Sequence, residues 1–199
     1  MVLSYRYPRS ALRATATNRE RKTVTDDHDA PEQVMWEGKY IVAKTRGRWE
    51  YVGRPRNIRA AVILAVEDGH VLLVEQYRVP LQKRCIELPA GLIGDEEEGE
   101  EALSAAAREL EEETGWRAAH VEEMGEFYSS PGMVSESFTL VRATGLTKTG
   151  DGGGVGGEDI TAHRVKLSEL AAFLEGKRAE GCGVDVRVMA LLVGGWIRT

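Results

Sequence analysis

The sequence contains few residues that could cross-link a fold or ligate a soft metal. Only two cysteines, Cys85 and Cys182, occur among 199 residues, and the four histidines are scattered. The cysteines lack metal-like spacing, so we expect reduced thiols in a cytoplasmic protein. No apolar run approaches eighteen residues, which argues against a membrane span. A disulfide scaffold, a zinc site and a transmembrane protein are therefore all disfavoured.

Basic residues are outnumbered by acidic ones, 26 Lys and Arg against 32 Asp and Glu. The formal net charge is −6 and the pI is about 5.4. A phosphate backbone requires a basic surface, so this balance argues against binding long nucleic acid. An apolar content of 42% in 199 residues is enough for one catalytic domain with an appendage. A small anionic ligand bridged by a metal ion remains compatible with this composition.

The acidity is concentrated in residues 94–116. This stretch holds ten acidic residues and one basic residue, a net charge of −9, so the rest of the chain carries +3. Apolar residues recur within it at helical spacing, which predicts an amphipathic helix over about Glu100 to Thr114. Gly115 follows, and glycine commonly ends helices because it adopts a left-handed conformation.

Three glutamates in this helix, Glu109, Glu112 and Glu113, have i, i+3 and i+4 spacing. Their carboxylates would therefore emerge side by side and repel one another unless a cation lies between them. Hard divalent cations with oxygen ligands, Mg²⁺ or Mn²⁺, suit such a cluster. The alternative is a solvated acidic face, although such a face would interleave lysines, and only Arg108 is present.

The spacing of this stretch resembles the Nudix box of the Nudix hydrolases. The matching positions are Gly94, Glu100, Arg108, Glu109, Leu110, Glu112, Glu113 and Gly115, with the bulky Trp116 where the family usually has a smaller apolar residue. The preceding Leu88-Pro89-Ala90-Gly91 resembles the loop of the ADP-ribose pyrophosphatase branch. Two or three extra acidic residues follow that loop, so its shape is expected to differ from that of its relatives.

Periodicity alone indicates an α/β or α+β fold, and the resemblance implies the Nudix fold, a mixed β-sheet sandwiched between helices. We expect a flexible tail over 1–33, an N-terminal antiparallel β extension used for dimerisation over 34–57, and the Nudix domain over 58–199. The expected strands are 34–36, 40–44, 49–52, 60–66, 71–77, 121–128, 137–143 and 160–165, with 86–88 in the connection that leads to the acidic helix. Further helices are expected over 168–176, with Ser168 as N-cap, and over 185–192. Six glycines within 150–157 predict a loop too flexible to order itself.

The resemblance implies a divalent metal site with Mg²⁺ as cofactor, or Mn²⁺ in its place. Its ligands would be Glu109, Glu112, Glu113 and the Ala90 carbonyl oxygen, and Glu112 and Glu113 would thereby act in catalysis. Glu100 would reach the metal through water. Arg108 would hold a carboxylate in place, although an ordinary surface ion pair is the alternative.

The general base implied by the resemblance is Glu158, within the sequence Gly157-Glu158-Asp159-Ile160. A glycine-rich flank would let this loop close over substrate. The competing interpretation is a polar surface loop with no catalytic part.

Four residues are candidates for substrate binding: Arg78, Arg54, Glu136 and Trp36. The resemblance assigns Arg78 to a phosphate, where a guanidinium is chemically suitable. Glu136 would accept hydrogen bonds from ribose hydroxyls, and a purely structural hydrogen bond is an equally favoured interpretation. Trp36 would stack on a base, although aromatic residues on a hairpin are more often cross-strand packing.

Together these features predict a Mg²⁺-dependent pyrophosphohydrolase of ADP-ribose or a related nucleoside diphosphate sugar. The small-molecule substrate would give a nucleoside monophosphate and a sugar phosphate, and the resemblance implies a homodimer. GDP-mannose or another nucleotide sugar is the alternative substrate. A non-catalytic nucleotide sensor is the alternative class, which the retention of every box glutamate disfavours.

Overall fold

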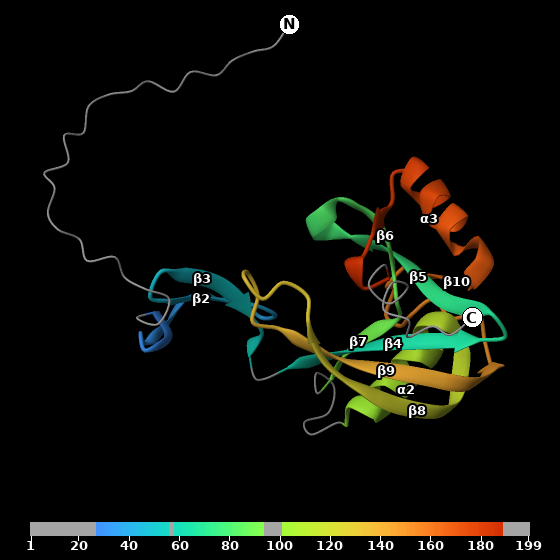
Figure 1. Ribbon diagram of the computed structural model, residues 1–199, viewed down its shortest axis with the longest axis horizontal. Helices are drawn as coiled ribbons and strands as arrows, with labels where there is room; N and C mark the ends of the chain where they lie inside the picture. The colour runs from blue at the N-terminus through green and yellow to red at the C-terminus, as the bar shows by residue number, and fades with distance from the viewer. Residues whose placement is uncertain (1–26, 56–57, 94–100, 189–199) are drawn as a thin grey trace, which may run out of the picture.

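The computed structural model describes residues 27–55, 58–93 and 101–188. Residues 1–26 of the expected tail, Glu100, and the end of the expected helix 185–192 lie outside these ranges. Within them, no helix is long and apolar enough to cross a membrane. Figure 1 shows an N-terminal group of strands beside a larger body in which helices flank a sheet.

The larger body is built on an eight-stranded mixed sheet. Its strands are β4 (Arg59–Glu67), β5 (His70–Arg78), β6 (Lys83–Glu87), β7 (Ala90–Ile93), β8 (Trp116–Tyr128), β9 (Ser137–Lys148), β10 (Thr161–Lys166) and β11 (Gly183–Val184). Hydrogen bonds connect them in the order β11-β6-β5-β4-β9-β8, while β10 pairs with β5 and β7 pairs with β4. β4 runs parallel to β9 and antiparallel to β5 and β7. The expected mixed sheet between helices is therefore confirmed.

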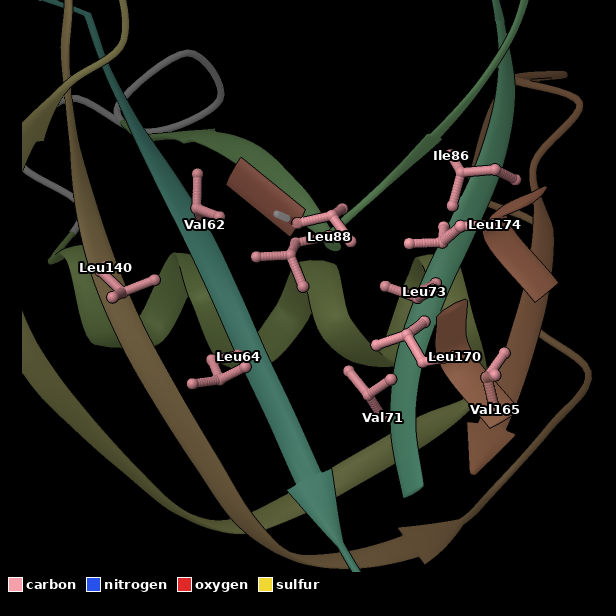
Figure 2. Close-up of a cluster of buried hydrophobic side chains, with 11 residues drawn as sticks. Val62, Leu64, Val71, Leu73, Ile86, Leu88, Leu140, Val165, Leu170 and Leu174 are labelled. Carbon is pink, nitrogen blue, oxygen red and sulfur yellow. The ribbon is translucent and has the colours of Figure 1, made fainter. Parts of the chain in front are cut away.

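The apolar run of β4 is continuous because both faces of this strand are buried. Val62 and Leu64 face one hydrophobic cluster, which includes Leu170 and Leu174 of helix α3 (Leu170–Ala179). Figure 2 shows these side chains meeting between the sheet and α3. The alternate β4 residues Ala61, Ile63 and Ala65 face a second cluster, together with Ala105, Ala106 and Leu110 of helix α2 (Ala102–Thr114). A strand alternates its side chains between faces, so one sequence run supports both layers.

The C-terminus of α2 is capped by the glycine-rich loop. Gly115 ends the helix at φ 70°, and its carbonyl oxygen accepts hydrogen bonds from the backbone N–H groups of Thr149 and Gly150. Gly153 and Gly154 donate to the carbonyl oxygens of Glu113 and Glu112, at 3.0 Å each. These are carbonyls that a helix end leaves without intrahelical partners. The loop was expected not to order itself, and the helix end supplies its order.

Close approach between the loop and α2 requires glycine. A Cβ on Gly115 would lie 2.2 Å from the Gly150 carbonyl oxygen. A Cβ on Gly152 would lie 2.5 Å from the Glu113 carbonyl oxygen. Both glycines also have positive φ, which glycine adopts without steric cost.

The N-terminal strands form a separate three-stranded antiparallel sheet. It contains β1 (Glu32–Glu37), β2 (Val42–Arg46) and β3 (Trp49–Gly53), in that order, which confirms the expected hairpin and the preceding strand. β1 begins at Glu32, inside the stretch assigned to the tail, and the buried Asp27 carboxylate accepts a hydrogen bond from Arg48 at 2.9 Å. This sheet contacts the body through Val52. The Val52 N–H donates a hydrogen bond to the Met133 carbonyl, and the Val52 carbonyl accepts one from the Ser135 N–H.

Three boundaries differ from those expected. β8 begins at Trp116, directly after the helix, and β9 continues to Lys148, so the β8–β9 pairing is longer than predicted. Ser168 is not a helix N-cap: it lies in a 3₁₀ turn, Leu167–Glu169, and the N-cap of α3 is Glu169, without a side-chain capping bond. Helical residues 186–188 follow Asp185, as expected for the last helix.

The contact between the loop and α2 predicts different costs for two glycine substitutions. Gly152 and Gly156 have similar φ values, 72° and 63°, but a Cβ on Gly156 meets nothing within 4 Å. Gly156→Ala should therefore lose about 1 kcal/mol of unfolding free energy from backbone strain alone. Gly152→Ala should lose a further 1–3 kcal/mol, roughly, because its Cβ would overlap the helix backbone. Urea unfolding of both variants measures the difference, and equal losses would contradict the contact.

Candidate active site

A cleft of about 600 Å³ opens at one edge of the sheet. Seven of the predicted site residues line it: Arg54, Arg78, Ala90, Glu109, Glu113, Glu136 and Glu158. They come from the segment after β3, from β5, β7 and α2, and from the loops before β9 and β10. The fold thus gathers in one place residues that are spread over more than one hundred positions in the sequence.

Glu109 and Glu113 are one turn apart on α2 and both are shielded from water. Glu113 is 6% exposed, and its Oε2 accepts a hydrogen bond from the Ala90 N–H at 3.0 Å. Burial raises the pKa of Glu113 to about 8, and the charges of Glu109 and Glu158 act in the same direction. Burial also raises the pKa of Glu109 to about 7, with Glu112 and Glu158 adding to the increase. Both carboxyl groups therefore lie where too little positive charge is present to favour their ionised forms.

Gly91 makes room for the carboxyl group of Glu109. A Cβ on Gly91 would lie 2.1 Å from Cδ of Glu109, so any larger residue would displace that side chain. The backbone of β7 therefore packs directly against the acidic face of α2. This gives a physical reason for the glycine in the Leu88–Gly91 loop that the sequence analysis noted only by resemblance.

Arg108 and Glu112 lie beside the cleft, and neither lines it. Arg108 Nη1 is 3.1 Å from Glu112 Oε2 and 3.2 Å from Glu109 Oε1. This guanidinium therefore holds two of the three clustered carboxylates at once, and one of them is a cleft residue.

Glu158 approaches the two helix carboxylates from the glycine-rich loop. Its Oε2 accepts a hydrogen bond from the Val155 N–H at 3.1 Å, within the same loop. The Glu158 side chain packs against Gly154, where a Cβ would come within 2.3 Å of Oε2. Glu158 lies near enough to Glu109 and Glu113 for its charge to raise the pKa of both. Three carboxylates thus face one cleft.

Arginines supply positive charge elsewhere in the cleft. Arg54 Nε donates to Glu136 Oε1 at 2.6 Å, which joins two predicted substrate residues. Arg78 donates to Glu87 through two bonds, Nε to Oε1 at 2.7 Å and Nη2 to Oε2 at 2.9 Å. Paired bonds of this kind fix the plane of a guanidinium group.

Three residues that the sequence analysis missed complete this side of the cleft. Glu87 is 3% exposed and accepts the Arg78 pair, and Arg187 Nη2 lies 3.5 Å from Glu87 Oε2. Asp185 holds Arg187 through bonds of 2.7 and 2.9 Å. Glu87 and Arg187 are one hundred positions apart, so only the buried placement of a glutamate at the end of an apolar strand could have indicated an ion pair there.

Cys85 also lines the cleft but is not a nucleophile. Burial, together with the charges of Glu87 and Asp185, raises the pKa of its thiol to about 11. The side chain is therefore a neutral thiol at physiological pH, and the thiolate is the form that would attack a substrate.

Trp36 does not line the cleft. It lies on β1 and is 57% exposed. Glu100 lies outside the described residues. The described part of the molecule therefore contains no aromatic stacking platform from the N-terminal sheet at the cleft of the same chain.

The donor chemistry of the cleft fits a hard divalent cation. Glu109 and Glu113 offer carboxylate oxygens on adjacent helical turns, and their raised pKa values show that positive charge would stabilise them. Among the described residues, no three carboxylate, histidine or cysteine side chains converge closely enough to hold a metal as they stand. The Ala90 carbonyl, Glu112 or Glu158 would have to add the remaining oxygen ligands.

Known proteins match this chain in sequence. Residues 55–181 match the model of the NUDIX domain family. The methanol dehydrogenase activator of Bacillus methanolicus is 36% identical over 119 residues, 59% of this chain and 63% of that protein. The ADP-ribose pyrophosphatase of Bacillus subtilis is 42% identical over 76 residues, 38% of this chain and 40% of that protein. The matches thus span less than two thirds of either relative.

A solved structure shares the fold. The crystal structure of an ADP compounds hydrolase superposes with a TM-score of 0.59 at 24% identity, covering 73% of this chain and 80% of that one. The chain therefore belongs to the NUDIX domain family, that of the Nudix hydrolases. The resemblance drawn from residues 94–116 is confirmed, and members of this family generally use divalent cations.

Proposed function

We propose that this protein hydrolyses the pyrophosphate bond of ADP-ribose or a related nucleoside diphosphate sugar with Mg²⁺, or Mn²⁺ in its place. One observation carries the proposal: the buried Glu113 and the half-buried Glu109 line the same cleft as Glu158, Arg54 and Arg78. Carboxylates for a cation and arginines for phosphates are the two requirements of a charged diphosphate substrate. The names of relatives that act on ADP-ribose support this substrate class.

Each cleft residue has a place in this chemistry. Glu109, Glu112, Glu113 and the Ala90 carbonyl would hold the cation, which when bound neutralises charge on the diphosphate. Glu158 would take the proton from the attacking water, because a general base must reach that water and no histidine lines the cleft within the described residues. Arg108 would keep the carboxylates of Glu109 and Glu112 oriented.

The two ends of the substrate would meet different groups. Arg78 and Arg54 would bind the phosphates, and Glu136 would accept hydroxyl groups of a ribose. Arg54 and Glu136 bond each other at 2.6 Å, so substrate would have to replace or share this contact. GDP-mannose or another nucleotide sugar remains the alternative substrate.

The exposed N-terminal sheet supports a homodimer. Val34, Met35, Trp36, Tyr40, Ile41 and Trp49 are all more than 40% exposed there. A second copy covering this surface would bury these side chains and would bring Trp36 to the neighbouring active site to stack on a base. Light scattering should give twice the 21.9 kDa chain mass, and a monomer at micromolar concentration would exclude the dimer.

The two free cysteines support a cytoplasmic location.

A substrate panel tests the proposed activity. The protein should be incubated with Mg²⁺ and ADP-ribose, GDP-mannose, UDP-glucose or a diadenosine polyphosphate, with products identified by chromatography. We expect ADP-ribose to give AMP and ribose 5-phosphate faster than the other compounds react. Faster turnover of GDP-mannose would favour the alternative substrate, and no turnover of any compound would favour a nucleotide sensor.

Two charge-removing substitutions should separate cation binding from proton transfer. Glu113→Gln should lower kcat by roughly two to three orders of magnitude and weaken Mn²⁺ binding, because it removes a ligand charge. Glu158→Gln should lower kcat by roughly 10²-fold or more while Mn²⁺ affinity changes little, because it removes the base. Mn²⁺ titration by electron paramagnetic resonance supplies the second measurement. Near-normal turnover in either variant would remove that residue from its proposed place.

A further inference from the structure

A short segment of the glycine-rich loop carries Glu158, and this segment is anchored at both ends. At its start, Gly153 and Gly154 donate backbone hydrogen bonds to the end of α2. At its other end, Asp159 accepts a hydrogen bond from Arg84 Nη1 at 2.9 Å, and the Asp159 carbonyl accepts one from Arg84 Nη2 at 3.2 Å. Glu158 directly precedes this second anchor.

Arg84 is itself fixed to the sheet. It lies on β6, and its Nε donates to Glu75 Oε1 on β5 at 2.7 Å, while Nη2 also donates to the Glu75 carbonyl at 3.0 Å. Glu75 is 7% exposed, so this ion pair is screened little by water. The guanidinium group therefore bridges two carboxylates, one in the sheet and one in the loop, and cannot rotate without losing both.

Glu75 is held in turn by two further groups. His163 Nε2 of β10 and Lys177 Nζ of α3 each lie 3.0 Å from Glu75 Oε2. Lys177 thus shares Glu75 with Arg84, and its ion pairs among the described residues are with Glu75 and Glu180, neither of which lies in the loop. A substitution of Lys177 therefore changes the surroundings of the buried Glu75 carboxylate without removing the bond between Arg84 and the loop.

The backbone at Asp159 has a conformation that the Arg84 contact helps to stabilise. Asp159 has φ 53°, a left-handed conformation that costs a non-glycine residue free energy. The only other bond from the sheet to this point is Gln76 Nε2 to the Glu158 carbonyl at 3.3 Å, among the described residues. Without Arg84, the turn would keep one bond within the loop, from the Ile160 N–H to the Gly153 carbonyl at 3.3 Å, and the long bond from Gln76, but it would lose its only ion pair to the sheet among the described residues.

We propose that Arg84 is a positioning residue for the reaction: through Asp159 it sets where the Glu158 carboxylate lies relative to Glu109 and Glu113. The inference rests on the proposed function of Glu158. A general base must lie within hydrogen-bond reach of the water it deprotonates, so a displacement of about 1 Å is enough to lower turnover up to 10²-fold. Arg84 would act on kcat without contacting substrate.

The test compares Arg84→Gln, Asp159→Asn and their double variant with Lys177→Met as the matched control. Asparagine tolerates the left-handed conformation, so Asp159→Asn removes the charge of an exposed side chain and leaves the backbone preference intact. We expect kcat of both single variants to fall about tenfold or more, with KM and Mn²⁺ affinity within about twofold. The double variant should be no slower than the slower single variant, because both break one contact. Lys177→Met should keep kcat within about threefold.

Hydrogen–deuterium exchange supplies a readout that does not depend on turnover. Peptides covering residues 155–160 should exchange faster in Arg84→Gln and Asp159→Asn than in the wild type and in Lys177→Met. Normal kcat and unchanged exchange in Asp159→Asn would overturn the inference, even if Arg84→Gln fails to fold. If those variants are normal while Glu158→Gln is slow, the positioning role alone fails. If Glu158→Gln is also normal, the proposed base fails with it.

Discussion

The structure depends on burying two like charges side by side. Glu109 and Glu113 lie one turn apart on α2, shielded from water, with pKa values raised to about 7 and about 8. One pKa unit corresponds to about 1.4 kcal/mol, so ionising both costs the fold on the order of several kcal/mol relative to exposed glutamates. A bound cation would remove this cost. The raised pKa values therefore support the proposed metal site by an argument that does not draw on family membership.

The fold offsets this cost by holding α2 in place on several sides. Its apolar face packs on the sheet, and the backbones of β7 and the glycine-rich loop lie against it. Leu110 and two alanines pack the apolar face into the sheet, so the acidic face must point toward β7 and the glycine-rich loop. Gly91 and Gly152 then allow those backbones to approach within distances that any side chain would prevent. Small residues therefore surround the carboxylates because the helix must be held close without being covered. The position of the acidic cluster is a result of packing on three sides.

Local features of the sequence predicted the parts of this arrangement that local physics determines. The helix 102–114, the paired strands β4 and β5 and the N-terminal hairpin all follow from periodicity and turn residues. The ion pair of Arg187 with Glu87 could not be predicted in this way, because the two residues are one hundred positions apart and meet only after folding. The pair of Arg78 with Glu87 spans nine positions, but it depends on the register between β5 and β6, which periodicity does not give. The extra length of β8 was missed because its residues are only half-buried or exposed, so its first residues carry no apolar run that would indicate a strand. Of the seven candidate residues at the cleft, Glu109 and Glu113 were indicated by helical spacing as well as by the motif, and most of the others came from the family resemblance.

The glycine-rich loop joins stability to catalysis through its backbone. Its first half supplies hydrogen bonds to the end of the helix that carries Glu109 and Glu113, and its second half carries Glu158. Gly154 and Asp159 are both anchored, so Glu158 lies in a short segment between two fixed points. Close contact with α2 explains Gly152, whereas a Cβ on Gly156 or Gly157 would meet nothing within 4 Å. The position of the Glu158 carboxylate relative to Glu109 and Glu113 is therefore set by the backbone anchors on either side of it.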